Sequence, residues 1–508
     1  MKRLLSLMLA AMMLFALVTV PAVAEATDEA ATNEAITPDT SWYSEDKTKF
    51  EISTAAQLKW FADEVNDGNP ALNARLMNDI DLSSVCSAAN GSWTPIGNHQ
   101  ENQKYSGTFD GQKHTIKNLY INETVVDVAS GNSYYRALFG NCESATIKNL
   151  TVTGEVTSDS CYVAGIVGRA WTTANSAAPV VIENCHNEVN VTSNCYDRPA
   201  GTGGITADAG NSTKITDCSN SGKIVGSGGR TGGITGGVSN DAVIDGCYNS
   251  GYVYNKGYSL NQLGTGGIAG GISTATIQNC YNTGKVEYYY RTQAHEQGVG
   301  GIAGYLEKGS AVISNSYNYG ELVLDNVTAE KGTRGGVLGG AKSGASYTLT
   351  NCFFAADENG RFGDQNTYGA KAVAAERLGT AEFVSSLGSR WQVSCPYAVL
   401  DWQTATPHTE PDSVTGKCTN CGAQLTGGNH APTLKEGIDE AAAAKTDTRT
   451  AYTLDLSTIF TDADEGDTLT YRVSVDNGAD ETVADGKFSK QYEEVGTHTF
   501  VFTANDSK

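Results

Sequence analysis

The chain has 508 residues, of which 57 are glycine and only 18% are charged, and its formal net charge is −22. Such an acidic chain lacks the basic surface that nucleic-acid binding requires, so we expect no nucleic-acid partner and favour a cation or a basic surface instead. The length allows two or three domains, and the glycine-rich, weakly charged composition suits short strands joined by tight turns.

Residues 1–24 have the three parts of a secretory signal peptide. Lys2-Arg3 is basic, Leu4–Val20 is apolar, and Ala22-Val23-Ala24 fits the small-residue cleavage rule. A retained membrane anchor is the alternative. After removal of this segment no other stretch is apolar and long enough to span a bilayer. We therefore expect a secreted or cell-surface protein, followed at residues 25–41 by an acidic, disordered linker.

The first predicted element after the linker is a helix within residues 50–65. Thr54 and Gln57 form a capping-box pair, and apolar residues then fall on one helical face. These are Leu58, Phe61, Ala62 and Val65. Because the end of a β-solenoid exposes unpaired strand edges, this helix is predicted to cover the first coil.

From about Thr115 to Cys352 one short unit recurs eight times, as in ATIQNCYN at 275–282. Successive copies are 29 to 36 residues apart, a period typical of solenoids with insertions in loops. The first apolar residues of the copies are Ile116, Ile147, Ile182, Ile215, Ile244, Ile277, Ile313 and Leu349.

Each copy contains three short apolar segments and one predicted bend. The bend position holds Asn118, Asn149, Asn184, Asp217, Gly246, Asn279, Asn315 or Asn351, all types that tolerate a left-handed backbone. A Gly-Gly-Ile-like segment precedes it, and a third apolar position follows nine residues after the first. This pattern predicts an all-β chain: a right-handed parallel β-helix whose coils stack at about 4.8 Å.

The alternation of Gly-Gly-Ile-Ala-Gly with Asn-Cys-Tyr-Asn-x-Gly resembles the GLUG-motif repeat of bacterial surface proteins. Tyr105–Gly111 and His114–Leu119 resemble the first coil of the same proteins. The resemblance covers residues 42–403. It implies a bacterial cell-surface location and an adhesive role toward host or cell-surface glycans or proteins.

Helical periodicity returns at Ala372–Leu387, which is predicted to form the second end cap, and Tyr397–Gln403 closes the domain. Residues 404–428 form a polar linker that contains Cys-x-x-Cys-Gly. His408, Cys418, Cys421 and His430 could together hold one zinc ion, since Cys-x-x-Cys-Gly is the usual zinc knuckle. The alternatives are a disulfide, for example with Cys395, or free thiols.

From residue 429 to 508 apolar and polar residues alternate in the manner of an antiparallel β-sandwich. Residues 460–471 resemble the cadherin-like, immunoglobulin-type modules of bacterial surface proteins, and in these a further strand follows the segment matched here by 501–506. We therefore expect an incomplete module. Asp462, Asp464 and Asp467, with Asp506 joining as the resemblance implies, could bind calcium, or could form a solvated acidic turn.

Two columns of identical residues are predicted to stack from coil to coil. One holds Cys185, Cys218, Cys247, Cys280 and Cys352, and the other holds Asn187, Asn220, Asn249, Asn282 and Asn318. Leucine occupies the cysteine position in other copies, which favours a buried thiol ladder over disulfides between coils. The asparagine column is predicted to be structural, through amide hydrogen bonds along the axis.

Tyrosines on adjacent coils are a candidate ligand surface. Tyr254, Tyr288, Tyr290 and Arg291 lie at or just beyond the third segment and could stack on sugars or pack against a protein. The alternative is that tyrosine simply favours exposed strands.

No catalytic constellation is apparent, since neither His-Glu-x-x-His nor Gly-x-Ser-x-Gly occurs. We therefore expect a non-catalytic, adhesin-like binding or structural protein. The alternative is a carbohydrate-active β-helix enzyme, a polysaccharide lyase or glycosidase, which would need a pair of carboxylates on one face.

Overall fold

The structure is a computed structural model that divides the chain into residues Met1–Asp39 and Thr40–Lys508. It describes residues 40–45, 48–98, 103–123, 135–173, 178–195, 201–257, 264–289, 297–325, 332–356, 368–409, 415–425, 432–435, 438, 444, 446–462 and 468–506. The predicted signal peptide lies outside the described residues. Among those described, no helix has both the length and the apolar character to cross a membrane.

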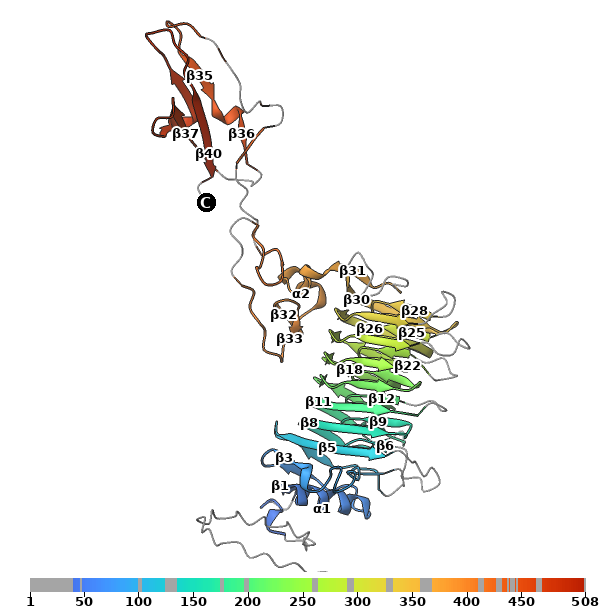
Figure 1. Cartoon of the computed structure of the whole chain (residues 1–508). Coiled ribbons are helices and arrows are strands. Elements are labelled where there is room, and N and C mark those ends of the chain that lie inside the picture. The colour runs from blue at the N-terminus through green and yellow to red at the C-terminus, as the bar shows by residue number, and fades with distance from the viewer. Residues whose placement is uncertain are drawn as a thin grey trace, which may run out of the picture. The chain divides into compact units, whose positions relative to one another are not determined.

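The described residues from Phe50 to Ala374 form a parallel β-solenoid, as the sequence predicts (Figure 1). It has about seven turns, whereas the eight repeat copies predict eight. Seven short strands form one wall: β6 (Tyr135–Arg136), β9 (Tyr162–Ala164), β12 (Gly201–Gly203), β17 (Arg230–Gly232), β21 (Gly264–Gly266), β25 (Gln297–Gly300) and β28 (Gly332–Gly335). The other walls belong to one sheet of 24 strands.

The strands of that sheet at the N-terminal end are β1 (Phe50–Ile52), β2 (Ala74–Leu76), β3 (Ile80–Asp81), β4 (Thr108–Asp110), β5 (Thr115–Glu123), β7 (Phe139–Cys142) and β8 (Thr146–Ser158). Its middle strands are β10 (Val167–Trp171), β11 (Val181–Ser193), β13 (Thr206–Gly210), β14 (Lys214–Thr216), β15 (Ser219–Asn220), β16 (Ile224–Gly226), β18 (Thr235–Asp245), β19 (Tyr248–Asn249) and β20 (Val253–Asn255). Its last strands are β22 (Ala269–Gln278), β23 (Tyr281–Asn282), β24 (Val286–Tyr289), β26 (Ala303–Asn318), β27 (Leu322–Asp325), β29 (Leu338–Ala341), β30 (Ser346–Ala356) and β31 (Lys371–Ala374).

The predicted repeat register is confirmed from Ile147 to Leu349. It is wrong for Ile116, which pairs with Ile80 and Val152, while Phe109 takes the place next to Ile147. Ile215 pairs with Ile244, and Ile244 pairs with Ile277, so these side chains form one buried column. The third apolar position stacks in the same way from Val156 to Leu322. All eight predicted bends are left-handed, with φ between 48° and 65°. The choice of Asn, Asp and Gly at this position is therefore a backbone requirement.

The cysteine column is buried, and its five members are free thiols. Each thiol lies 3.0–3.4 Å from the carbonyl oxygen of the residue two positions earlier on its own strand. Each sulfur atom also lies 3.3–3.9 Å from a carbonyl oxygen of the preceding coil, so the buried thiols of the ladder face backbone carbonyls in both coils.

The asparagine column is fully buried and hydrogen-bonded from coil to coil. Each Nδ2 donates to the Oδ1 of the next asparagine at 2.7–2.8 Å, from Asn187 through Asn318. The same Nδ2 also donates to a backbone carbonyl two residues later, at 2.8–3.1 Å. Both amide hydrogens are therefore satisfied, which removes the cost of burying the group.

A column of glycines faces these amides from the Gly-Gly-Ile segments. A Cβ on Gly204 would lie 2.4 Å from Oδ1 of Asn220, and the same conflict recurs at Gly165, Gly233, Gly267 and Gly301. Where the register replaces asparagine by Val152, the glycine position holds Leu138. At the other end Phe354 takes the asparagine position and the glycine is kept, because a Cβ on Gly336 would lie 2.2 Å from Cγ of Phe354.

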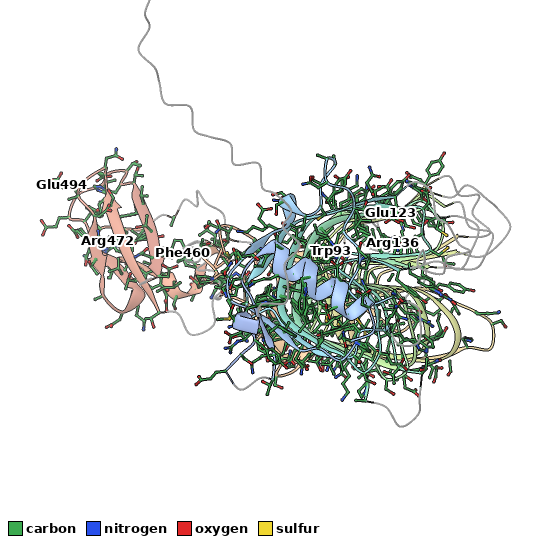
Figure 2. All side chains as sticks on the ribbon, turned by 90° about the horizontal axis from the view of Figure 1, so that it is seen from below. Trp93, Glu123, Arg136, Phe460, Arg472 and Glu494 are labelled. Carbon is green, nitrogen blue, oxygen red and sulfur yellow. The ribbon has the colours of Figure 1, made fainter. Side chains whose placement is uncertain are left out.

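The helix α1 (Ala55–Asn66) covers the N-terminal end of the solenoid, as predicted (Figure 2). Its capping box is formed by Thr54 and Gln57. The predicted face, Leu58, Phe61, Ala62 and Val65, is buried in the solenoid core. The core extends from this helix to Ala370.

The second predicted helix differs from its expectation. Residues 371–374 form β31, which continues the sheet beyond β30, and only α2 (Ala381–Leu387) is α-helical. After α2 come β32 (Trp391–Gln392) and β33 (Val399–Leu400), an antiparallel pair. Helical periodicity could not distinguish these elements because an alternating strand and a 3-10 turn also place apolar residues on one side.

Residues 375–409, which we call the strap, pack on side chains that the coils project outward. His186, Ser219, Tyr248, Tyr281, Tyr317 and Phe353 lie in register on successive coils, and we call this set the aromatic column. Phe383 and Trp391 of the strap contact the ring of Tyr317. Trp402 stacks on His186 at 5.6 Å and lies 5.7 Å from Tyr248.

The C-terminal module contains small antiparallel sheets. β37 (Leu469–Val475) lies between β38 (Glu481–Val483) and β40 (Phe500–Asp506). β35 (Tyr452–Asp455) pairs with β39 (Lys487–Lys490), and β34 (Thr433–Leu434) pairs with β36 (Phe460–Thr461). A separate core forms around Leu456, Tyr471, Val473, Val483 and Phe488. The alternating pattern of this segment thus correctly predicts antiparallel strands.

Candidate metal centre and charged face

Cys395, His408, Cys418 and Cys421 converge at the end of the strap. Cys395 lies between the antiparallel strands β32 and β33. Its N–H donates to Thr406 O at 2.8 Å, which holds this segment beside the end of the strap. Cys418 and Cys421 lie in a tight turn closed by hydrogen bonds from Gly422 N to Cys418 O and from Cys418 N to Ala423 O. Gly422 has φ of 72°, which explains the glycine after the second cysteine.

The four ligand atoms all lie within 4.8 Å of one another. Cys395 Sγ is 3.9 Å from Cys418 Sγ, and Cys421 Sγ is 3.4 Å from His408 Nδ1. A tetrahedral zinc site with Zn–S bonds of about 2.3 Å has sulfur atoms about 3.8 Å apart. The observed arrangement therefore fits a four-coordinate Cys₃His site.

His408 is held in the orientation that a metal ligand requires. Its Nε2 is 3.0 Å from Gly379 O, so a proton on Nε2 leaves Nδ1 as the free lone pair facing the thiols. A metal-bound histidine usually donates its second ring N–H to a carboxylate, a water or, as here, a backbone carbonyl. A Cβ on Gly379 would lie 3.1 Å from Cε1 of His408 and 2.4 Å from Ser394 O, so this glycine makes room for the ring.

The surroundings favour a thiolate at Cys418. A hydrogen bond with the Thr409 hydroxyl, 3.1 Å away, lowers the pKa of Cys418 to about 5, helped by His408 and by the backbone N–H groups of Cys421 and Asn420. Burial, then the neighbouring sulfur atoms, raises the pKa of Cys395 to about 12. A bound cation would reverse that second effect, because it favours the deprotonated form of every ligand.

This cluster corrects one ligand of the predicted set. The structure brings His408, Cys418 and Cys421 together, and Cys395 takes the fourth position, whereas His430 lies outside the described residues. Spacing alone could not choose Cys395, because it precedes the knuckle by 23 residues and reaches it through the β32–β33 pair. Gly379 and Thr409 had no recognisable signal in the sequence.

The predicted calcium residues are only partly described. Asp464 and Asp467 lie outside the described residues. Asp506 is buried at the end of β40, opposite Leu469, the first residue of β37. Asp462 lies just after β36. The two described aspartates therefore flank the segment that holds the other two, and calcium binding stays a prediction.

The predicted tyrosine surface does not form as expected. Tyr288 is buried in the solenoid core, with 2% of its surface exposed, and pairs in register with Asn255. Tyr254 pairs with Glu287 and stacks on Tyr252. Because successive strand residues point to opposite faces, Tyr254 and Tyr288 cannot belong to one aromatic row. Tyr290 and Arg291 lie outside the described residues.

A different face of the solenoid carries a cluster of charged side chains from several coils. Arg169, Asp208, Gly237, Gly271 and Tyr305 follow one another in register from β10 to β26. The Arg169 guanidinium lies 4.5 Å from the ring of Trp171 and donates to the hydroxyl of Tyr135 at 3.2 Å. Its Nε is 3.5 Å from Asp208 Oδ2. We call this set the charged face.

Arg230 completes the charged face from β17. Its side chain lies across Gly237 and Gly271, because a Cβ on these glycines would lie 3.0 and 2.6 Å, respectively, from Arg230 Cδ. Its Nη2 donates to Glu307 Oε2 at 2.7 Å, and its Nε donates to the other oxygen of the same carboxylate. Burial raises the pKa of Asp208, although Arg169 and Arg230 oppose the shift. The four charged side chains keep 12–28% of their surface exposed.

No family model and no curated protein match the chain. Among solved structures, it is similar to a protein from Bacteroides ovatus described as a "putative immunoglobulin A1 protease". The two share 20% sequence identity over 71% of this chain and 94% of that one, with a TM-score of 0.46.

Proposed function

We propose that the protein is an exported, non-catalytic binding module of the bacterial cell surface, adhesin-like toward a glycan or protein ligand. The charged face is the observation that supports this proposal. A glycan that crosses several coils would meet an aromatic ring at Trp171, fixed cations at Arg169 and Arg230, and carboxylate acceptors at Asp208 and Glu307. An aromatic ring offers an apolar face, and charged groups offer strong hydrogen bonds, and a sugar ring can use both.

The experiment is binding of residues 25–508 to arrays of glycans and extracellular-matrix proteins. We expect a ligand whose Kd weakens at least tenfold in Trp171→Ala, since the ring both stacks and holds Arg169. Tyr347→Ala is the matched control, because Tyr347 is exposed on β30, away from the charged face, and should leave Kd unchanged. Equal loss in both variants, or no binding on either array, would contradict the proposal.

A carbohydrate-active enzyme is the second candidate, favoured by Asp208 and Glu307. A buried carboxyl with a raised pKa is the type of group that donates a proton to a leaving sugar, and a second carboxylate lies across Arg230 on the same face. Release of reducing or unsaturated ends from a polysaccharide panel, abolished in Asp208→Asn with ligand binding retained, would favour this candidate. Binding without turnover would favour the first.

We further propose that Cys395, His408, Cys418 and Cys421 bind one structural Zn²⁺ that fastens the strap. Three thiolates and one imidazole make a closed ligand set, which leaves no coordination position for a substrate. Metal analysis of the purified chain should find one zinc per molecule. Cobalt substitution should give thiolate-to-metal charge-transfer absorption. Cys395→Ser should lower both signals, and Cys352→Ser should not, since Cys352 belongs to the ladder.

The GLUG-type and cadherin-like resemblances, the signal peptide and calcium binding belong to the same proposal. Their support is the repeat pattern, the composition of residues 1–24, and the aspartates at the edge of the C-terminal module. Calcium, but not magnesium, should raise the melting temperature through Asp462, Asp464, Asp467 and Asp506, because Mg²⁺ demands stricter octahedral geometry. An unchanged melting temperature in tens of millimolar calcium would mean that these aspartates form a solvated turn and bind no calcium.

A further inference from the structure

Two cysteines outside the ladder meet at a corner between successive coils. Cys161 and Cys195 have their Sγ atoms 2.6 Å apart. Both are free thiols in this structure, like the ladder cysteines. Both side chains are buried, with 9% and 5% of their surface exposed.

The strand register on both sides of the corner brings the two residues together, and this evidence is independent of the positions of the sulfur atoms. Before the corner, Ser158 of β8 pairs in register with Ser193 of β11. After it, Tyr162 of β9 pairs with Gly201 of β12. Cys161 and Cys195 therefore lie on adjacent coils, one position out of the β8–β11 register. Adjacent coils are about 4.8 Å apart, and a disulfide tolerates Cα separations of about 4.4–6.8 Å, so the backbone is compatible with a bond.

Hydrogen bonds between buried groups make this corner rigid. Ser193 Oγ donates to Ser160 O at 3.2 Å, and Gly201 N donates to Cys161 O at 2.8 Å. Asn194 N donates to Ser158 O at 2.9 Å. These bonds set the position of both cysteines on the backbone, so bringing the sulfur atoms together needs little further ordering.

The ladder thiols offer a contrast within the same molecule. Cys218 and Cys247 also occupy adjacent coils, but each thiol lies 3.2–3.6 Å from two backbone carbonyl oxygens, one in its own coil and one in the preceding coil. Burial raises the pKa of both thiols well above the ordinary value, which disfavours the thiolate that disulfide exchange requires. Stacking on adjacent coils is therefore not sufficient for a bond.

We propose that Cys161 and Cys195 form a disulfide that links two successive coils. The oxidant is a disulfide compound RSSR, such as oxidised glutathione or a protein disulfide. One thiolate attacks RSSR, forms a mixed disulfide and releases RS⁻. The second thiolate then attacks the mixed disulfide and releases another RS⁻. The two thiol protons go to these anions, so two RSH form for each bond, and the two cysteines lose two electrons.

The bond closes a loop over 34 positions of the chain and fixes the corner from which β9 and β12 begin. It would make the solenoid more stable where disulfides persist than where they are reduced. This inference does not depend on the ligand-binding role proposed above.

The test is peptide mapping of the full-length chain. Reduced protein is equilibrated with oxidised glutathione, then unfolded and alkylated without reductant. We expect a cross-linked peptide that contains Cys161 and Cys195, with the five ladder cysteines alkylated. Alkylated Cys161 and Cys195 at saturating oxidant, or either residue linked to another cysteine, would overturn the proposal.

Melting with and without a phosphine reductant gives an independent readout, because each protein is its own reference. The oxidised wild-type chain should lose about 3 °C or more on reduction. Cys161→Ser and Cys195→Ser should not respond. Cys352→Ser should respond like the wild type, and it is a tolerated change because Ser316 occupies the same position in the preceding coil. An equal response in all four proteins would refute the assignment.

Discussion

At many core positions of the solenoid, contacts with the neighbouring coil determine which residue type fits. The amide of Asn249 donates to Asn282 and to Gly251, and accepts from Asn220. Gly233 has no Cβ because that atom would lie 2.5 Å from the Oδ1 of Asn249. Asparagine and glycine thus form a matched pair across the core, and each constrains the other.

Asn249→Ala should lower the free energy of unfolding by about 2–5 kcal/mol, because it leaves buried partners on both neighbouring asparagines unsatisfied. Asn249→Asp should cost more, since it buries a charge in place of a donor. Urea titration measures both. Asn190→Ala is the control: Asn190 is exposed and accepts one hydrogen bond from Lys223 N, so its loss should cost under about 1 kcal/mol. Similar costs at both positions would show that the amide column contributes little.

Sequence periodicity could predict the residue-level pattern of the solenoid with unusual completeness. The left-handed bends follow from Asn, Asp and Gly at one position, and the columns follow from identical residues at a fixed offset. Tyr288 is not part of the predicted tyrosine surface, because it stacks on Asn255 of the preceding coil and faces the core, whereas Tyr254 stacks on Glu287. A period of two, counted from Val286, would have placed it in the core.

At the scale of elements, the strap docks where Gly246 leaves space for one of its side chains. Gly246 interrupts the column of asparagine bends, and a Cβ there would lie 2.3 Å from Asp217 Oδ1 and 2.5 Å from Arg390 Nη2. Arg390 uses this space to pair with Asp217, and Trp402 Nε1 donates to Gly246 O at 3.1 Å. The sequence could not predict this docking, because it joins residues 173 positions apart.

Metal removal should loosen the end of the strap without unfolding the coils. With a strong zinc chelator, we expect faster amide hydrogen exchange in residues 391–425 and unchanged exchange in β18 and β22. Gly379→Ala should mimic the chelator in part, because its Cβ would displace His408. Gly478→Ala, in the C-terminal module, is the control. Unchanged exchange in residues 391–425 after metal removal would mean that the four ligands do not fasten the strap.

The N-terminal coils should be sensitive to acid through Asp79. Hydrogen bonds from Lys117 and from the backbone of Thr115 lower the pKa of Asp79 to about 2, from an ordinary value of 3.8. A lowered folded-state pKa gives stability that is present above about pH 4 and lost as the pH falls through 2. The urea midpoint should therefore drop less steeply from pH 4 to pH 2 in Asp79→Asn than in the wild type. Parallel curves would mean that this pair does not contribute.

At the scale of the whole solenoid, the aromatic column is a surface that needs a cover. Tyr281, Tyr317 and Phe353 are buried only because the strap lies on them with Phe383, Trp391 and Leu400. Contiguous exposed aromatic surface promotes association. The strap therefore has a role for the coils, whatever ligand the protein binds.

A chain ending at Ala374 should expose the aromatic column and self-associate, while a chain ending at Leu425 should not. Light scattering during size-exclusion chromatography would measure the difference as a larger mass, rising with concentration, for the shorter chain. The charged face is common to both chains, so it cannot explain a difference. If both chains have the mass of a monomer, the uncovered aromatic column does not cause self-association.

The amide column has one further consequence, for how such a protein can change its length. All four amide bonds run in the same direction, so each inner coil presents a donor on one side and an acceptor on the other. A duplicated inner coil could therefore be inserted between two existing coils, and its asparagine would hydrogen-bond to both neighbours without any other substitution. Val152 and Phe354 occupy the same register beyond the two ends of the column. Gain and loss of coils by recombination is therefore expected between residues 187 and 318, and the flanking coils should keep their sequence.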